Sequence, residues 1–247
     1  MDLLTIQSFY SAAQNRLAFL NNYSKDMERS IDNYLYEHIK GISAMDLEVQ
    51  SQYGETPVPS YYDESSLRTR QLLNDSPTML RHSLLSMYIA QLEHTLRGIH
   101  IQFEKQGIID LNSEENNPNN KKRQVSSEDL GIARLINSFS KVLDLSNLTK
   151  SDVWSDILFY IKIRNRIAHS AGYVHSVISK QHKSLYDSLK TEEGHELKRE
   201  SHGVFLGTYH DIQLDRTISE RIKERCSSIL KLLMDAIMEK NGIKQSM

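Results

Sequence analysis

The residues best suited to chemistry are an arginine, a carboxamide and a histidine in the segment 163–172. Arg164, Asn165 and His169 stand at an Arg-Asn-x3-His spacing. In a helix, Asn165 and His169 differ by only ~40° around the axis, so they share a face. Histidine exchanges a proton near neutral pH, and a guanidinium matches a pair of phosphate oxygens. Together these residue types suit chemistry on a phosphodiester.

Positive charge is concentrated around these residues. The window 157–186 contains no Asp or Glu, while the whole chain has a formal net charge of -2. Its basic residues are Lys162, Arg164, Arg166, Lys180 and Lys183. A basic patch on an acidic protein is typical of a surface that binds a polyanion, although such residues often only solvate a helix face. We expect Lys162 and Arg166 to bind substrate.

The same residue types predict RNA cleavage without a metal or cofactor. His169 could take the proton of a ribose 2′-hydroxyl as that oxygen attacks phosphorus, while Arg164 stabilises the developing negative charge. A second acid must protonate the leaving 5′-oxygen, and one chain supplies only one such histidine. Two copies related by a two-fold axis would supply both, which predicts a homodimer. The ten histidines lack the spacing of a zinc site.

The elements that must position these residues are predicted to be helices. Gly and Pro together number only 14, and no proline follows Pro118. Apolar periodicity predicts helices over most of the first 43 residues, from Ser76 to about Phe103, and over about 127–143, 152–168 and 217–240. Val204–Leu206 and Tyr209–Leu214 are rich in β-branched and aromatic residues, which predicts a hairpin.

Boundary signals and apolar stripes refine these helices. Gly41 is expected to end the first helix, Gln50–Ser66 to form a loop, and Ser76 to cap the next helix with Pro77 at its first position. Three apolar stripes are predicted: Leu17, Leu20, Met27, Ile31, Tyr34, Leu35, His38 and Ile42; Leu80, Leu84, Met87, Tyr88, Leu92, Leu96, Ile99 and Phe103; and Trp154, Ile157, Leu158 and Ile161.

The fold class predicted is all-α, an antiparallel helical bundle with a small β-hairpin before the last helix. Residues 1–247 are expected to form a single domain with an N-terminal helical extension over 1–45 and a mobile loop over 106–125, which contains Lys121-Lys122-Arg123. At 39% apolar and 25% charged residues, with no leader and no run of ~18 apolar residues, the chain is expected to be cytoplasmic, with no membrane partner.

The Arg-Asn-x3-His element of Arg164, Asn165 and His169, at the end of one helix and followed by another, resembles the HEPN superfamily, whose members carry Arg-x4-6-His. The resemblance implies a helical-bundle homodimer with a composite, metal-independent endoribonuclease site at its interface. Arg164 and His169 would be the catalytic pair and Asn165 the variable polar residue. It also implies a toxin-antitoxin toxin or an antiviral defence effector, with an antitoxin or regulatory protein as partner.

Two features leave alternatives open. The HEPN toxins silenced by a nucleotidyltransferase carry a tyrosine two residues after the histidine. This chain has Ala171 at that position, so the resemblance does not extend to control through that tyrosine. Glu93 either orients Arg164 or His169 or is an ordinary surface carboxylate. The chain could also be a HEPN-like dimerisation module, or a module that binds RNA or protein without cleaving it, because fold alone does not establish activity.

Overall fold

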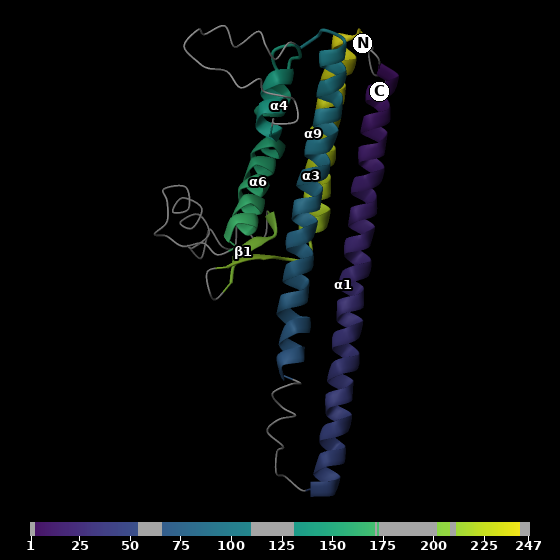
Figure 1. Cartoon of the computed structure of the whole chain (residues 1–247), viewed down its shortest axis with the longest axis vertical. Coiled ribbons are helices and arrows are strands. Elements are labelled where there is room, and N and C mark those ends of the chain that lie inside the picture. The colour runs from purple at the N-terminus through teal and green to yellow at the C-terminus, as the bar shows by residue number, and fades with distance from the viewer. Residues whose placement is uncertain are drawn as a thin grey trace, which may run out of the picture. The chain divides into compact units, whose positions relative to one another are not determined.

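The computed structural model describes residues 3–53, 66–109, 131–170, 172, 202–207 and 211–242 (Figure 1). The protein is mostly helical and has a small two-stranded antiparallel hairpin before its last helix, as predicted. Within the described ranges, no helix combines the length and the apolar character that crossing a membrane requires.

In the described part of the chain, helices account for all the elements except the two strands of the hairpin. The elements are α1 (Leu3–Tyr53), the short π-helix η1 (Gln71–Asp75), α3 (Ser76–Lys105), α4 (Ile132–Phe139), α5 (Ser146–Thr149), α6 (Asp152–Ser170), β1 (Val204–Leu206), β2 (Ile212–Leu214) and α9 (Ile218–Lys240). The predicted helices over 152–168 and 217–240 and the hairpin are confirmed. The helix predicted over 127–143 is confirmed for 132–139, and residues 127–130 lie outside the described ranges, as do 110–125 of the predicted loop.

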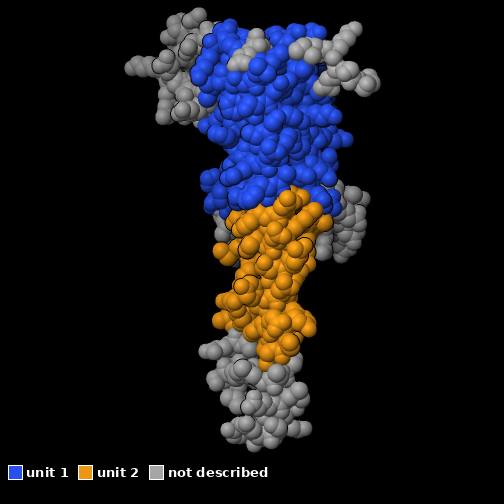
Figure 2. Space-filling model, turned by 90° about the vertical axis from the view of Figure 1, so that its right-hand side faces the viewer, with its two compact units in different colours: residues 1–20, 85–173, 220–247 blue, residues 21–84, 174–219 orange. Residues whose placement is uncertain are grey.

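The chain forms two compact units, coloured separately in Figure 2. Unit 1 contains residues 1–20, 85–173 and 220–247, and unit 2 contains 21–84 and 174–219. Both α1 and α3 therefore contribute residues to each unit. Residues 3–45 of the predicted N-terminal extension, 1–45, are part of α1, and residues 1–2 lie outside the described ranges.

Unit 1 has an apolar core to which α1, α3, α4, α6 and α9 contribute. Its fully buried residues include Ile6, Leu17, Leu92, Leu96, Ile99, Phe103, Leu135, Ile136, Phe139, Ile157, Ile163, Ile222, Ile229 and Leu233. On α3 they recur at steps of three and four, which confirms most of the predicted stripe. A Cβ at Gly98 would lie 2.7 Å from the Phe9 ring, so glycine lets α1 and α3 approach closely at this level.

Polar contacts tie the hairpin of unit 2 to α1 and α3, and the hairpin also buries Val204, Ile212 and Leu214. Arg81 on α3 donates from Nε and Nη2 to Glu28 of α1, at 2.6 and 2.8 Å, and from Nη1 to the Leu214 carbonyl at 2.9 Å. The next residue, His82, lies with Nε2 2.9 Å from the Ile212 carbonyl. Arg216, after β2, pairs with Asp32 of α1. Side chains of α1 and α3 thus hold the second strand of the hairpin.

The predicted end of the first helix at Gly41 is wrong, because α1 runs on to Tyr53. Residues 50–53 of the loop predicted over Gln50–Ser66 are helical instead, and residues 54–65 lie outside the described ranges. A helix-ending glycine has a left-handed backbone, and Gly41 is not among the positive-φ glycines. A single glycine costs a helix only about 1 kcal/mol relative to alanine, which the surrounding good helix formers outweigh.

The predicted cap at Ser76 is also wrong. Residues 66–75 are already helical, and Ser76 has a helical backbone with φ -65° and ψ -46°. Its N–H donates to the Gln71 carbonyl, five residues back, which makes one π-helical turn. Pro77 has no N–H to donate and its ring crowds the preceding turn, so a wider turn immediately before it is a common way to keep the helix continuous.

Candidate functional site

Helix α6 positions the predicted catalytic residues. Its start is capped by Ser151, whose Oγ accepts a hydrogen bond from the Trp154 N–H at 3.2 Å. Its end at Ser170 is followed by Gly172, which has φ +83° and so supports a turn out of the helix. These two signals place Arg164, Asn165 and His169 in the last turns of a helix inside unit 1.

The buried face of α6 differs from the predicted one. Ile157, Tyr160 and Ile163 are buried to 1% exposure or less, whereas Trp154, Leu158 and Ile161 are only half-buried. The prediction was therefore wrong by a rotation of the helix. Because α6 carries large apolar residues on most of its sides, its sequence periodicity does not single out the face that packs inward.

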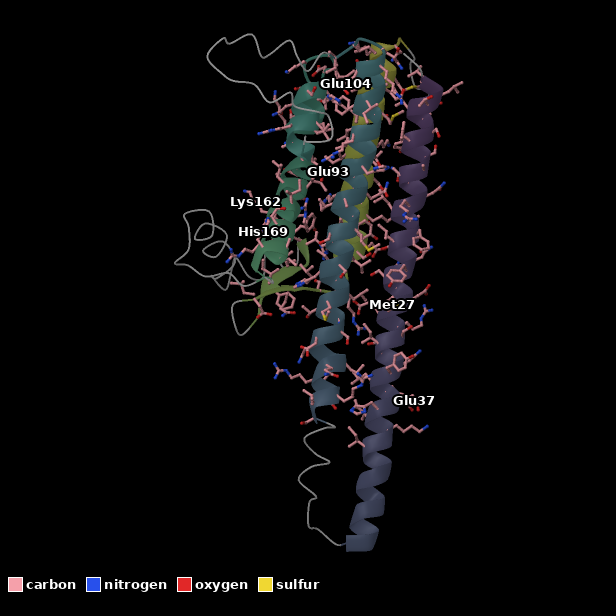
Figure 3. The ribbon with its side chains drawn as sticks, in the orientation of Figure 1. Met27, Glu37, Glu93, Glu104, Lys162 and His169 are labelled. Carbon is pink, nitrogen blue, oxygen red and sulfur yellow. The ribbon has the colours of Figure 1, made fainter. Side chains whose placement is uncertain are left out.

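Asn165 and His169 are both exposed, which agrees with their shared face. Arg164 is partly covered, with 31% of its side chain exposed. Lys162 is exposed and lies on the side of α6 away from α3 (Figure 3). The carboxamide and the imidazole are thus open to a ligand from outside this chain.

The guanidinium of Arg164 is paired with a carboxylate of the neighbouring helix. Its Nη2 lies 3.9 Å from Oε2 of Glu93 on α3, and Figure 3 shows Glu93 between the two helices. Arg97, one turn further along α3, donates from Nη2 to the other oxygen of the same carboxylate. Glu93 therefore serves two guanidiniums. This outcome matches the possibility that Glu93 orients Arg164 rather than lying alone on the surface.

Within one chain, Arg164 and His169 point in different directions. The two positions differ by ~140° around the helix axis. In the described part of the chain, neither a hydrogen bond nor an ion pair joins them. The guanidinium of Arg164 and the imidazole of His169 are therefore not brought together inside a single copy, because the guanidinium lies toward Glu93 on α3.

Arg166, the second predicted substrate contact, is buried, with 7% exposure. Its removal from water lowers its pKa from the usual value, because burial disfavours the charged form. Contact with substrate through Arg166 stays a prediction, and among the two residues only Lys162 is exposed. Lys180, Lys183, Ala171 and the cluster 121–123 lie outside the described ranges.

Arg97 was not among the residues predicted from the sequence. The signal was available, because Glu93 and Arg97 stand four residues apart on a helix, which is the spacing of an ion pair. Over the described ranges, no three His, Cys, Asp or Glu side chains are grouped closely enough to hold a metal ion.

No family model matches this chain, and neither the curated proteins nor the solved structures contain a match to it. The candidate site therefore stands on its own residues: an exposed Asn165 and His169 at the end of α6, and an Arg164 anchored by Glu93.

Proposed function

We propose that the protein is a metal-independent endoribonuclease of HEPN type, active as a homodimer with a composite site. The observation that carries the proposal is the Arg-Asn-x3-His element at the end of α6 in a mostly helical protein. Exposure of Asn165 and His169 and the anchoring of Arg164 support it. The expected products are a 2′,3′-cyclic phosphate or 3′-phosphate and a 5′-hydroxyl.

Each residue has a distinct role in this proposal. His169 of one copy takes the proton of the 2′-hydroxyl, and the histidine of the second copy gives a proton to the leaving 5′-oxygen. Arg164 stabilises the negative charge on the phosphorane-like transition state. Asn165, on the same exposed face as His169, donates a hydrogen bond to a phosphate oxygen. The divergence of Arg164 and His169 within one chain supports a site completed by a second chain.

Glu93 is a positioning residue in this scheme. A guanidinium held by a carboxylate has less freedom to lose when it binds phosphate, and it keeps one orientation. We therefore expect the Glu93→Gln variant to lower kcat by about tenfold with little change in KM. The substitution loosens the orientation of Arg164, which matters more for stabilising the transition state than for binding the substrate. If Glu93 only supported the fold, Glu93→Gln would lower the free energy of unfolding and leave kcat unchanged.

The activity is tested with a fluorescently labelled RNA in the presence of EDTA. Cleavage persists in the wild type, and His169→Ala and Arg164→Ala each reduce it by about 100-fold or more. His94→Ala and Arg134→Ala are matched controls, because both residues are exposed and lie on α3 and α4. Loss of wild-type cleavage on chelation, or undiminished cleavage by both site variants, overturns the proposal.

The composite site is tested by mixing wild type with His169→Ala and allowing subunits to exchange. If both histidines serve each reaction, a mixed dimer is inactive, and an equal mixture keeps about one quarter of the wild-type activity. If each chain acts alone, the mixture keeps about one half. The two outcomes separate a shared site from an independent one, with His94→Ala as the mixing control.

The proposed biological role is that of a toxin-antitoxin toxin or an antiviral defence effector in the cytoplasm. Expression of the wild type then arrests growth, and His169→Ala relieves the arrest while accumulating to the same level. Growth arrest that persists in His169→Ala would assign toxicity to something other than RNA cleavage. A partner protein that suppresses the arrest would be the antitoxin.

The second candidate function is a catalytically silent dimerisation module. The pairing of Arg164 with Glu93 favours this function, because an arginine in an ion pair between two helices can have a structural role instead of a catalytic one. In this case the purified protein leaves RNA intact, and His169→Ala weakens self-association in sedimentation experiments. An unchanged dimer together with RNA cleavage would exclude it.

A further inference from the structure

A row of exposed side chains runs along the outer face of α1 within unit 2. Its six members are Asn22, Lys25, Arg29, Asn33, Tyr36 and Lys40, at steps of three and four residues. We call this row the α1 stripe. Residues at these steps lie on one face of a helix. The buried residues Ser24, Glu28 and Ile31 of the same segment lie on the opposite side, so the α1 stripe faces outward.

The charges of this segment are sorted by face. Glu28 is buried and bound by Arg81, and Asp32 is bound by Arg216, so the charges of both carboxylates are offset within unit 2. Asp26 and Glu37 flank the stripe on one side, and Glu37 projects away from α3 (Figure 3). No carboxylate stands in the row itself, and Lys25, Arg29 and Lys40 contribute three positive side chains to it.

The carboxylate paired with Arg29 does little to neutralise its charge. Asp26 lies 3.6 Å from the Arg29 guanidinium, but the two side chains are 70% and 73% exposed. An ion pair so open to water contributes little and is easily exchanged for another anion. Arg29 therefore stays available to a polyanion that brings several phosphates at once.

Tyr36 is placed within the α1 stripe and is 65% exposed. An aromatic ring interleaved with lysine, arginine and asparagine provides what single-stranded nucleic acid needs: cations for the phosphates, a flat surface for a base, and amides for hydrogen bonds. From Lys25 to Lys40 the row spans roughly 22 Å, enough for several nucleotides.

We propose that the α1 stripe binds single-stranded RNA. The choice of RNA over other polyanions rests on the proposed function. The position and exposure of the stripe residues do not depend on that function. The stripe would hold substrate through contacts independent of Arg164 and His169. The part of α1 that belongs to unit 2 would then have a role in binding in addition to its role in the fold.

The test measures binding of the full chain to a fluorescent oligouridine made with 2′-O-methyl ribose, which cannot be cleaved through its 2′-oxygen. Changing Lys25, Arg29 and Lys40 together to Ala weakens binding by about ten- to a hundredfold and reduces the salt slope by about two. The matched control changes Arg134, Lys150 and Lys231 to Ala, which removes the same charge from exposed positions of unit 1. Equal losses in both triple variants overturn the proposal.

Two neighbouring tyrosines test the stacking. Tyr36 and Tyr34 are 65% and 67% exposed but lie on nearly opposite sides of α1, ~160° apart. Tyr36→Ala weakens binding of the oligouridine by about tenfold, Tyr36→Phe does not, and Tyr34→Ala does not. Binding to inorganic polyphosphate, which has no bases, is unaffected by Tyr36→Ala. An equal effect of both alanine changes, or no effect of Tyr36→Ala, overturns the stacking and reduces the stripe to a general polyanion surface.

Failure of this proposal is distinguishable from failure of the nuclease. The oligouridine binds His169→Ala as tightly as wild type if the α1 stripe is the binding surface. An absence of cleavage with intact, stripe-dependent binding leaves this inference standing. Cleavage that is unaffected by the triple stripe variant, together with unchanged binding, refutes it.

Discussion

Units 1 and 2 use the same two helices in different ways. In unit 1, α3 buries Leu92, Leu96 and Ile99 completely. In unit 2, the first turns of α3 instead present Arg81 and His82 to the hairpin and to α1. One helix thus changes along its length from an apolar core element to a polar anchor. Continuity of secondary structure therefore does not imply continuity of the interactions that stabilise it.

The two kinds of interaction respond differently to change. Apolar burial is non-directional, stabilises by about 25 cal/mol per Å² and loses strength in proportion to the area removed. A buried ion pair contributes little net stability while intact, but removing one partner leaves a charge without compensation. Unit 2 should therefore be the more sensitive of the two to loss of a single charged residue.

The largest effect is expected from Glu28→Ala, which leaves Arg81 without its bidentate partner. Unit 2 loses about 3 to 5 kcal/mol, as measured by faster hydrogen exchange in peptides covering 66–84 and 204–214. Asp26→Ala, at an exposed position two residues earlier, removes the same charge and leaves exchange unchanged. Equal protection in both variants would show that the ion pair does not hold the hairpin.

Leu96→Ala should destabilise unit 1 by about 3 kcal/mol, because it removes a fully buried side chain from the apolar core. Trp154, the only tryptophan, lies on α6 in unit 1, so its fluorescence during urea unfolding reports on that unit. Met87→Ala, at a position 42% exposed on the same helix, is the control. A midpoint that moves equally in both variants would contradict an apolar core around Leu96.

Acid should weaken both units through one histidine in each. Burial lowers the pKa of His100 in unit 1 and of His82 in unit 2. The unfolded chain then takes up a proton below pH ~6.5 that the folded chain resists, so stability is complete above that pH and falls as the pH decreases.

His100→Gln removes the part of this pH dependence that Trp154 fluorescence follows, and His82→Gln leaves that part in place. Urea midpoints at neutral and mildly acidic pH measure the difference. His100 is fully buried, with Nε2 2.9 Å from Ser138 Oγ and the Glu104 carboxylate 3.8 Å from Nδ1. An unchanged pH dependence in His100→Gln would assign the acid effect to other groups.

The smallest effect is expected from Arg216→Ala. Its side chain is 58% exposed, and its guanidinium pairs with Asp32 and lies 3.5 Å from Glu28. The loss should be about 0.2 to 1 kcal/mol, confined to unit 2, and it should vanish in high salt because exposed pairs are screened. A loss as large as that of Glu28→Ala would mean that Arg216, rather than Arg81, is the main partner.

The sequence predicted the elements of the fold better than their limits. Apolar periodicity gave the long stripe of α3 and the bounds of α6 and α9, since these depend on local steps of three and four residues. It failed at Gly41 and Ser76, because each residue has the composition of a boundary yet lies inside a continuous helix. Local signals compete with propagation of the helix, and the neighbouring turns decide the outcome.

The sequence by itself determined which residues could act on phosphate and that they share a helix end. Only the tertiary structure decided that Arg164 turns to Glu93, that Arg166 is buried, and that Ile157 rather than Trp154 faces the core. The physical reason is that periodicity describes one helix about its own axis. The rotation at which helices meet, and the carboxylate that a long side chain then reaches, depend on residues far apart in the chain.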